Sequence, residues 1–155
     1  TETLTKQVIM KNRYFEDFKI GEIYNLPSRT QTSGIFSMFQ GTSGDNDPIH
    51  YDREFCIKKG HKNMLAHGIQ VLSQTAAGAG TFPSEVRESL IGMIEISGKF
   101  LKAVYLNDTL YPSLKITKLT PQNTTGIICM KATVKNQNGI IVFEGQHKYL
   151  IKKRN

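Results

Sequence analysis

The chain has 155 residues, of which 39% are hydrophobic and 21% are charged, a balance typical of one globular domain with its own core. The sequence contains no apolar run of transmembrane length and no secretory signal at its start, so we expect no membrane contact. The net charge of +7 comes from scattered lysines, not from one stripe, and does not indicate nucleic-acid binding. Two distant cysteines fit a reducing, cytoplasmic compartment.

The first half of the chain is expected to hold a tail, one strand and three helices. These are a tail over 1–14, a strand over 22–32, short helices over 34–40 and 52–60, and a main helix over 67–80. Pro27 bends the strand or places it at an edge. Ser33 and Asp52 are the expected helix caps. The main helix is rich in glycine and alanine, so packing and not propensity must hold it.

From Leu90 onward, apolar residues recur at every second position, the period of a half-buried strand. Four strands are expected, at about 90–100, 113–117, 128–135 and 140–151. Gly98 is predicted to form a bulge, and Asn138-Gly139 predicts a hairpin turn. This order predicts one α+β domain over 1–155, in which a curved antiparallel sheet wraps around a central helix.

The segment 43–50 combines a carboxylate with an imidazole. It reads Ser-Gly-Asp-Asn-Asp-Pro-Ile-His, and Pro48 disfavours helix at the residue before it. A turn can therefore direct Asp45 and His50 toward one point. With no serine or cysteine nucleophile in a recognisable motif, such a pair indicates proton transfer or activation of water.

Gly68 lies at the start of the main helix, where backbone N–H groups favour developing negative charge. Close packing against the sheet is the simpler explanation of the same glycine. The histidine spacings near Asp45 match no standard zinc pattern, so no metal is predicted. A basic cluster nearby suits a phosphorylated small molecule or is a solvated loop. Its members are Arg53, Lys58, Lys59 and Lys62.

These residues resemble a known family. The segment 43–50, with Phe39 before it and Ala66-His67-Gly68 after it, is similar to the (R)-specific enoyl-CoA hydratases, or MaoC-like dehydratases. Their motif reads Gly-Asp-x-Asn-Pro-x-His, followed by an Ala-His-Gly helix start. The specific part spans 39–68, and the order of elements agrees over most of the chain. The resemblance implies a hot-dog fold, a homodimer or higher oligomer with joined sheets, and no nucleic-acid partner.

The resemblance also implies a reaction. Asp45 and His50 would activate a water that adds to a 2-enoyl thioester, or that leaves an (R)-3-hydroxyacyl thioester, while the Gly68 N–H stabilises the thioester oxyanion. No cofactor is implied, because the CoA or acyl-carrier-protein thioester is itself the substrate. The expected substrate contacts are Asp47, Pro48, Ile49, Ala66, His67, Lys58, Lys59 and Lys62.

Two alternatives share the fold: an acyl-CoA thioesterase and a non-enzymatic acyl-CoA-binding module. The chain also departs from the family pattern, because Asp47 stands where the family has asparagine. A second carboxylate there either favours protonation of Asp45 or only starts the turn, as asparagine would.

Overall fold

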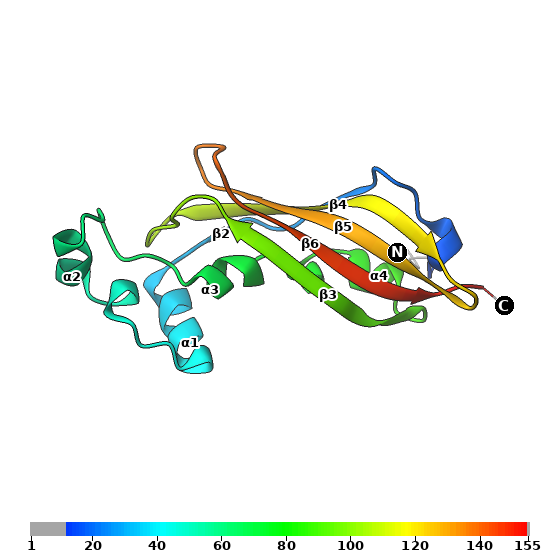
Figure 1. Ribbon diagram of the computed structural model, residues 1–155, viewed down its shortest axis with the longest axis horizontal. Helices are drawn as coiled ribbons and strands as arrows, with labels where there is room; N and C mark the ends of the chain where they lie inside the picture. Colours follow the sequence, from blue (N-terminus) through cyan, green and yellow to red (C-terminus); the bar gives the residue numbers. More distant parts are fainter. Residues whose placement is uncertain (1–11, 155) are drawn as a thin grey trace, which may run out of the picture.

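The computed structural model describes residues 12–154. Figure 1 shows one long antiparallel sheet with α3 and α4 along one face and α1 and α2 beyond one end. The strand order is β1-β4-β5-β6-β3, and β2 also pairs with β4. The strands are β1 (Ile23–Asn25), β2 (Arg29–Thr30), β3 (Leu90–Phe100), β4 (Thr109–Pro121), β5 (Thr125–Lys135) and β6 (Ile141–Lys152). The helices are η1 (Phe15–Asp17), α1 (Ser33–Ser43), η2 (Pro48–His50), α2 (Arg53–Lys58), α3 (Gly68–Ser73), η3 (Ala77–Ala79) and α4 (Phe82–Glu85).

The core lies between the sheet and the short helices. The inward positions of β4, β5 and β6 alternate with outward ones, as the period of two predicts. They pack against Val71 of α3 and Phe82 of α4 in one buried cluster. The predicted α+β hot-dog architecture is confirmed. None of the helices within residues 12–154 is long and apolar enough to cross a membrane.

The central helix is shorter than predicted. The expected helix over 67–80 is α3 followed by the separate turn η3, with Ala76 in a non-helical conformation between them. The Leu72 carbonyl oxygen accepts from the Thr75 hydroxyl at 2.8 Å and from the Thr75 N–H at 3.0 Å, whereas the Ala76 N–H, its partner in a continuing α-helix, donates to the Ser73 carbonyl oxygen. Such competition ends a helix whose small residues give it little propensity of its own.

Local signals at the other elements were mostly correct. Pro27 divides the expected strand into β1 and β2. Asp52 caps α2 by accepting from the Phe55 N–H at 3.0 Å, as predicted. Thr32 and not the predicted Ser33 caps α1, because the Thr32 side chain accepts from the Ile35 N–H. The Asn138-Gly139 hairpin turn is confirmed between β5 and β6.

Gly98 does not form a bulge. The irregularities of β3 lie near its start, between Leu90 and Gly92 and between Met93 and Glu95. Gly98 instead pairs in register, and a Cβ placed on it would lie 2.3 Å from the Phe143 ring. The glycine is therefore required by close packing of a core aromatic ring.

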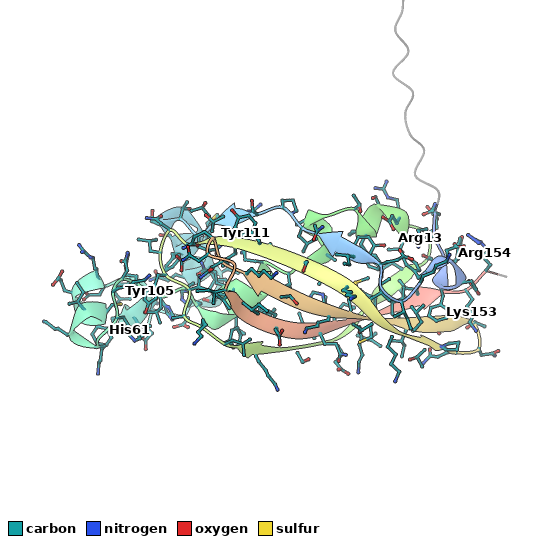
Figure 2. The ribbon with its side chains drawn as sticks, turned by 90° about the horizontal axis from the view of Figure 1, so that it is seen from above. Arg13, His61, Tyr105, Tyr111, Lys153 and Arg154 are labelled. Carbon is teal, nitrogen blue, oxygen red and sulfur yellow. The ribbon has the colours of Figure 1, made fainter. Side chains whose placement is uncertain are left out.

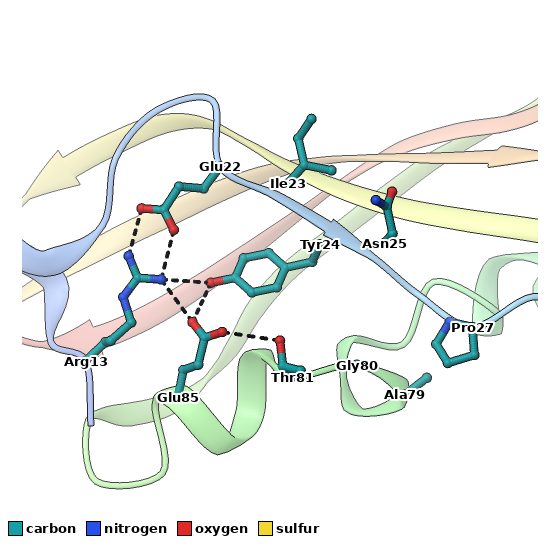
Figure 3. A pocket seen from close by; sticks show the side chains of 10 residues that line it. All are labelled: Arg13, Glu22, Ile23, Tyr24, Asn25, Pro27, Ala79, Gly80, Thr81 and Glu85. Carbon is teal, nitrogen blue, oxygen red and sulfur yellow. Dashed lines mark hydrogen bonds and ion pairs between the residues drawn. The ribbon is translucent and has the colours of Figure 1, made fainter. Parts of the chain in front are cut away.

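Arg13 belongs to the fold, although it falls within the predicted tail. Residues 1–11 of that tail lie outside the described part of the chain. The Arg13 guanidinium donates to Glu22 at 2.7 Å and to Glu85 at 2.9 Å, and the Tyr24 hydroxyl donates to Glu85 at 2.8 Å (Figure 3). Hydrogen bonding to Arg13 lowers the pKa of Glu22, and burial raises that of Tyr24. These contacts fasten the start of the described chain to β1 and α4.

Candidate active site

The turn between α1 and η2 positions Asp45. Gly44 ends α1 in a left-handed conformation with φ 72°, and Asp47 caps η2 by accepting from the Ile49 N–H at 3.0 Å. The Asp47 N–H in turn donates to Asp45 Oδ1 at 3.2 Å. Asp45 Oδ2 faces two imidazole rings, at 3.7 Å from His50 Nε2 and 3.9 Å from His67 Nε2.

The tautomer of His50 follows from its hydrogen bond. Its Nδ1 lies 2.7 Å from the Leu65 carbonyl oxygen, which can only accept. Nδ1 therefore carries a proton, and in the neutral ring Nε2 is the acceptor that faces Asp45. The distance of 3.7 Å between Asp45 Oδ2 and His50 Nε2 is too long for a direct hydrogen bond but suits a shared water.

His67 lies beneath His50. Their rings stack with centroids 3.6 Å apart and planes inclined by 22°, and Phe39 packs on the His67 ring at 4.8 Å. His67 precedes α3 but makes no side-chain cap bond to it. Its Nε2 lies 3.2 Å from the Asp45 carbonyl oxygen. His67, which was predicted as a substrate contact, therefore contacts the catalytic candidate Asp45 directly.

Gly68 is the first residue of α3 and lines a cavity of about 230 Å³. The first N–H groups of a helix have no partner within the helix. A Cβ on Gly68 would lie 3.3 Å from the Phe100 ring, so the packing explanation of this glycine also has support. The other residues that line the cavity are Leu65, Ala66, Val71, Phe100, Leu101, Lys102, Ala103 and Val104.

One backbone hydrogen bond joins the segment 43–50 to the residues before α3, and a second joins those residues to the segment after β3. The Leu65 N–H donates to the Ile49 carbonyl oxygen at 3.1 Å. The Ala66 N–H donates to the Val104 carbonyl oxygen at 2.8 Å. Pro48 opens η2 at its first position. The structure therefore brings Asp45, His50 and Gly68 to one place, with Pro48, Ile49 and Ala66 as the surrounding backbone.

Of the three predicted lysines, Lys62 lines a cavity, whereas Lys58 and Lys59 line neither this one nor the cavity at Gly68. Lys58 ends α2 and Lys59 follows it, and both are exposed. Lys62 lies over the Tyr105 ring at 4.7 Å and lines a second cavity of about 420 Å³. Figure 2 shows Tyr105 and His61 at the end of the molecule opposite Arg13 and Arg154.

Lys102 was not predicted. It lines both the cavity at Gly68 and the cavity at Lys62. No sequence motif marks this lysine, because its place depends on where β3 ends relative to α3.

Asp45, His50 and His67 place three potential metal-ligand atoms close together. The ligand atoms of Asp45, His50 and His67 lie within 4.8 Å of one another. Because the two imidazoles are stacked, their Nε2 atoms point side by side and do not converge on one position. A tetrahedral ion needs ligands that approach from separate directions, so this geometry does not fit zinc.

Comparison with known proteins supports the resemblance. Residues 17–139 match the family model described as MaoC like domain. The chain belongs to this family. It is 29% identical over 147 residues to the uncharacterized protein YdeM of Bacillus subtilis, covering 89% of this chain and 98% of that protein. It is also 29% identical over 143 residues to the (R)-specific enoyl-CoA hydratase of Rhodospirillum rubrum, covering 91% and 93%.

A solved structure agrees with the fold over nearly the whole chain. It is described as a monoamine oxidase regulatory protein from Archaeoglobus fulgidus. The TM-score is 0.86 at 27% identity, and the match covers 95% of this chain and 99% of that one. The family membership predicted from Asp45, His50 and Gly68 is confirmed, whereas the roles of these residues stay predictions.

Proposed function

We propose that the protein is a hydro-lyase that adds water to a 2-enoyl thioester or removes it from an (R)-3-hydroxyacyl thioester. The observation that carries this proposal is the pairing of Asp45 Oδ2 with His50 Nε2 at 3.7 Å, close to the apolar cavity at Gly68. Two named relatives support it: the (R)-specific enoyl-CoA hydratase already described and a 3-hydroxyacyl-[acyl-carrier-protein] dehydratase of Arabidopsis thaliana, 25% identical over 131 residues.

The proposed reaction needs a water held between the two side chains. Asp45 and His50 remove one proton from this water as its oxygen bonds to C3 of the enoyl group. The double-bond electrons move toward the thioester oxygen, which the Gly68 N–H stabilises. The pair then returns a proton to C2, and the electrons move back from the oxygen. Dehydration is the reverse sequence, and neither direction requires a cofactor.

The substrate is proposed to lie along the two cavities. The acyl thioester occupies the cavity at Gly68, whose lining is largely apolar. Lys102 lines both this cavity and the second one, where Lys62 and Tyr105 form part of the wall. These two lysines suit the phosphates of CoA or of a carrier protein's prosthetic arm. Lys58 and Lys59, at the exposed end of α2, are further candidates for contact with these phosphates.

A second copy of the chain is the proposed partner. β3 is an edge strand of 11 residues, whereas the opposite edge strand β1 has three. An exposed apolar edge strand is a template for pairing with another chain. The exposed apolar residues of β3 are Ile91, Met93, Ile94, Ile96 and Phe100. Because Phe100 also touches the Gly68 position, the partner would cover one side of the acyl cavity.

The test follows enoyl absorbance across a panel of enoyl-CoA chain lengths. Asp45→Asn and His50→Ala are each expected to lower kcat by about 100-fold or more, since positioned acid–base groups contribute on the order of 10²–10⁴-fold. Asp52→Asn is the matched control, because asparagine caps α2 as well as aspartate does. Near-normal turnover in either site variant would contradict the pair. Release of free thiol by the wild type would favour the thioesterase instead.

A further inference from the structure

A chain of buried polar side chains leads from β2 to the catalytic candidate Asp45. Gln31 Nε2 donates to the Arg29 carbonyl oxygen at 3.2 Å, and Gln70 Nε2 donates to Gln31 Oε1 at 3.0 Å. Gln70 Oε1 lies 3.3 Å from His67 Nδ1. Gln31, Gln70 and His67 are each at most 2% exposed, so these partners must satisfy their polar groups. We call Gln31, Gln70 and His67 the glutamine relay.

The Arg29 carbonyl oxygen, at the start of the relay, sets the donor and acceptor of every hydrogen bond that follows. A carbonyl oxygen can only accept, so Gln31 must present its NH₂ group to Arg29 and its Oε1 to Gln70. Gln70 must then donate to Gln31 and present its own Oε1 to His67. An oxygen at this position requires a proton on His67 Nδ1. Reversing either amide would oppose two oxygens or two NH₂ groups.

The other nitrogen of His67 also faces acceptors. Its Nε2 lies 3.2 Å from the Asp45 carbonyl oxygen and 3.9 Å from the Asp45 carboxylate. A neutral ring with its proton on Nδ1 would turn the Nε2 lone pair toward these oxygens. A ring that carries both protons donates at each end instead, and the carboxylate balances its charge.

We infer that the glutamine relay holds His67 as an imidazolium that faces Asp45 and positions its carboxylate for catalysis. The titratable groups placed against the His67 ring, within residues 12–154, are Asp45 from the turn before η2 and His50 from η2. The His50 ring stacks on the His67 ring, and the Phe39 ring from α1 packs against it as well. His67 acts through Asp45 and is a positioning residue; its role in turnover rests on the proposed function.

The relay gives a positioning role to residues that do not contact the substrate. Gln31 lies on the segment after β2 and is remote from the Asp45–His50 motif, yet it sets the proton on His67 Nδ1 through Gln70. Removing the Gln31 amide would free Gln70 to rotate and donate to Nδ1. The ring could then discard that proton and keep one on Nε2, toward Asp45.

Nitrogen-15 NMR of ligand-free protein labelled at histidine tests the inference without any activity. The chain has four histidines, and His67→Asn identifies the signals of His67. At pH 7.5, both ring nitrogens of His67 are expected to be protonated in the wild type. Gln31→Leu and Gln70→Leu are each expected to convert Nδ1 to the unprotonated form. Gln74→Leu is the matched control, because the Gln74 side chain donates to the Gln70 carbonyl oxygen and the Ser73 hydroxyl and not to the side-chain amides of the relay, so this variant should leave both signals unchanged.

Two further variants keep the inference falsifiable if a leucine variant fails to fold. Gln70→Glu retains an acceptor at Nδ1, and a proton on its other carboxyl oxygen replaces the amide donor to Gln31 Oε1, so this variant is expected to preserve the doubly protonated ring. Gln31→Met is a longer apolar replacement for Gln31. An unprotonated nitrogen on His67 in the wild type would overturn the inference. A doubly protonated ring in folded Gln31→Leu or Gln31→Met would overturn it as well.

The kinetic arm separates this inference from the proposed function. If the protein is a hydratase, folded Gln31→Leu and Gln70→Leu should lose about tenfold or more in kcat, with KM within about twofold of the wild type, as expected for a lost catalytic orientation. If the wild type hydrates no enoyl thioester, the proposed function fails while the NMR result still decides the relay. Unchanged kcat in both variants, with hydration present in the wild type, would refute the positioning role.

Discussion

Acid should weaken the fold through His147, which lies buried on β6 under the end of α3. His147 Nε2 lies 2.8 Å from the Thr75 hydroxyl, and its Nδ1 lies 2.8 Å from the Tyr149 hydroxyl. Because the Thr75 hydroxyl donates to the Leu72 carbonyl oxygen, it accepts from His147 Nε2–H. Nδ1 is then the acceptor for the Tyr149 O–H, and the network is satisfied by a neutral ring.

Burial lowers the pKa of His147 below its ordinary value of 6.5. Above pH 6.5 the ring is neutral in both the native and unfolded chains, and its contribution to stability is complete. As the pH falls through 6.5, the unfolded chain takes up a proton that the native ring resists. The free energy of unfolding should therefore fall, by at most about 1.4 kcal/mol per pH unit for one proton, until the pKa of the native ring is reached.

The assay is urea denaturation at intervals from pH 8 to pH 5. Burial raises the pKa of Tyr149 to about 12, so its hydroxyl remains a donor over this range. His147→Gln cannot titrate and is expected to remove this part of the acid dependence, whatever its effect on stability at pH 8. His61→Gln, in the loop after α2, is the matched control. An acid slope as steep in His147→Gln as in the wild type would refute the reasoning.

Three other outcomes are expected. Sedimentation should show a homodimer that Ile96→Lys on β3 dissociates and Ile23→Lys on the opposite edge does not; an intact Ile96→Lys dimer would exclude pairing through β3. Gly98→Ala should lower the free energy of unfolding by roughly 1–3 kcal/mol, measured in urea, because its Cβ would meet the Phe143 ring at 2.3 Å; an unchanged midpoint would show that the ring moves aside. Arg13→Met should cost roughly 2 kcal/mol, seen as a lower Tm, because two carboxylates lose a charged donor; a Tm equal to that of the wild type would contradict an anchoring role.

The local signals in this sequence were sufficient for the architecture. Apolar residues at every second position mark strands because successive side chains on a strand face opposite sides of a sheet. Asp52 and the Asn138-Gly139 pair act through hydrogen bonds or backbone angles within a few residues, so their effect could be inferred without the rest of the fold. The same holds for the turn that carries Asp45 and His50.

Contacts between distant segments were decided only by the tertiary structure. Gly98 was predicted to bulge because nothing local reveals that a Phe143 ring occupies the place of its side chain. The main helix ends early, before Thr75, whose hydroxyl bonds both the Leu72 carbonyl oxygen and the buried His147 from the distant strand β6. Lys102 reaches the site only because β3 ends beside α3.

The sequence by itself determined the fold class, the family and the pairing of Asp45 with His50, since each depends on a periodic pattern or a short motif. It did not reveal that His67 stacks on His50, or that Gln31 and Gln70 connect His67 to β2. Gln31 precedes Gln70 by 39 positions in the sequence, and only the packing of α3 beneath the sheet brings the two side chains within hydrogen-bonding distance. Hydrogen-bond direction, unlike hydrophobic periodicity, is a property of the assembled partners, which is why the structure had to supply it.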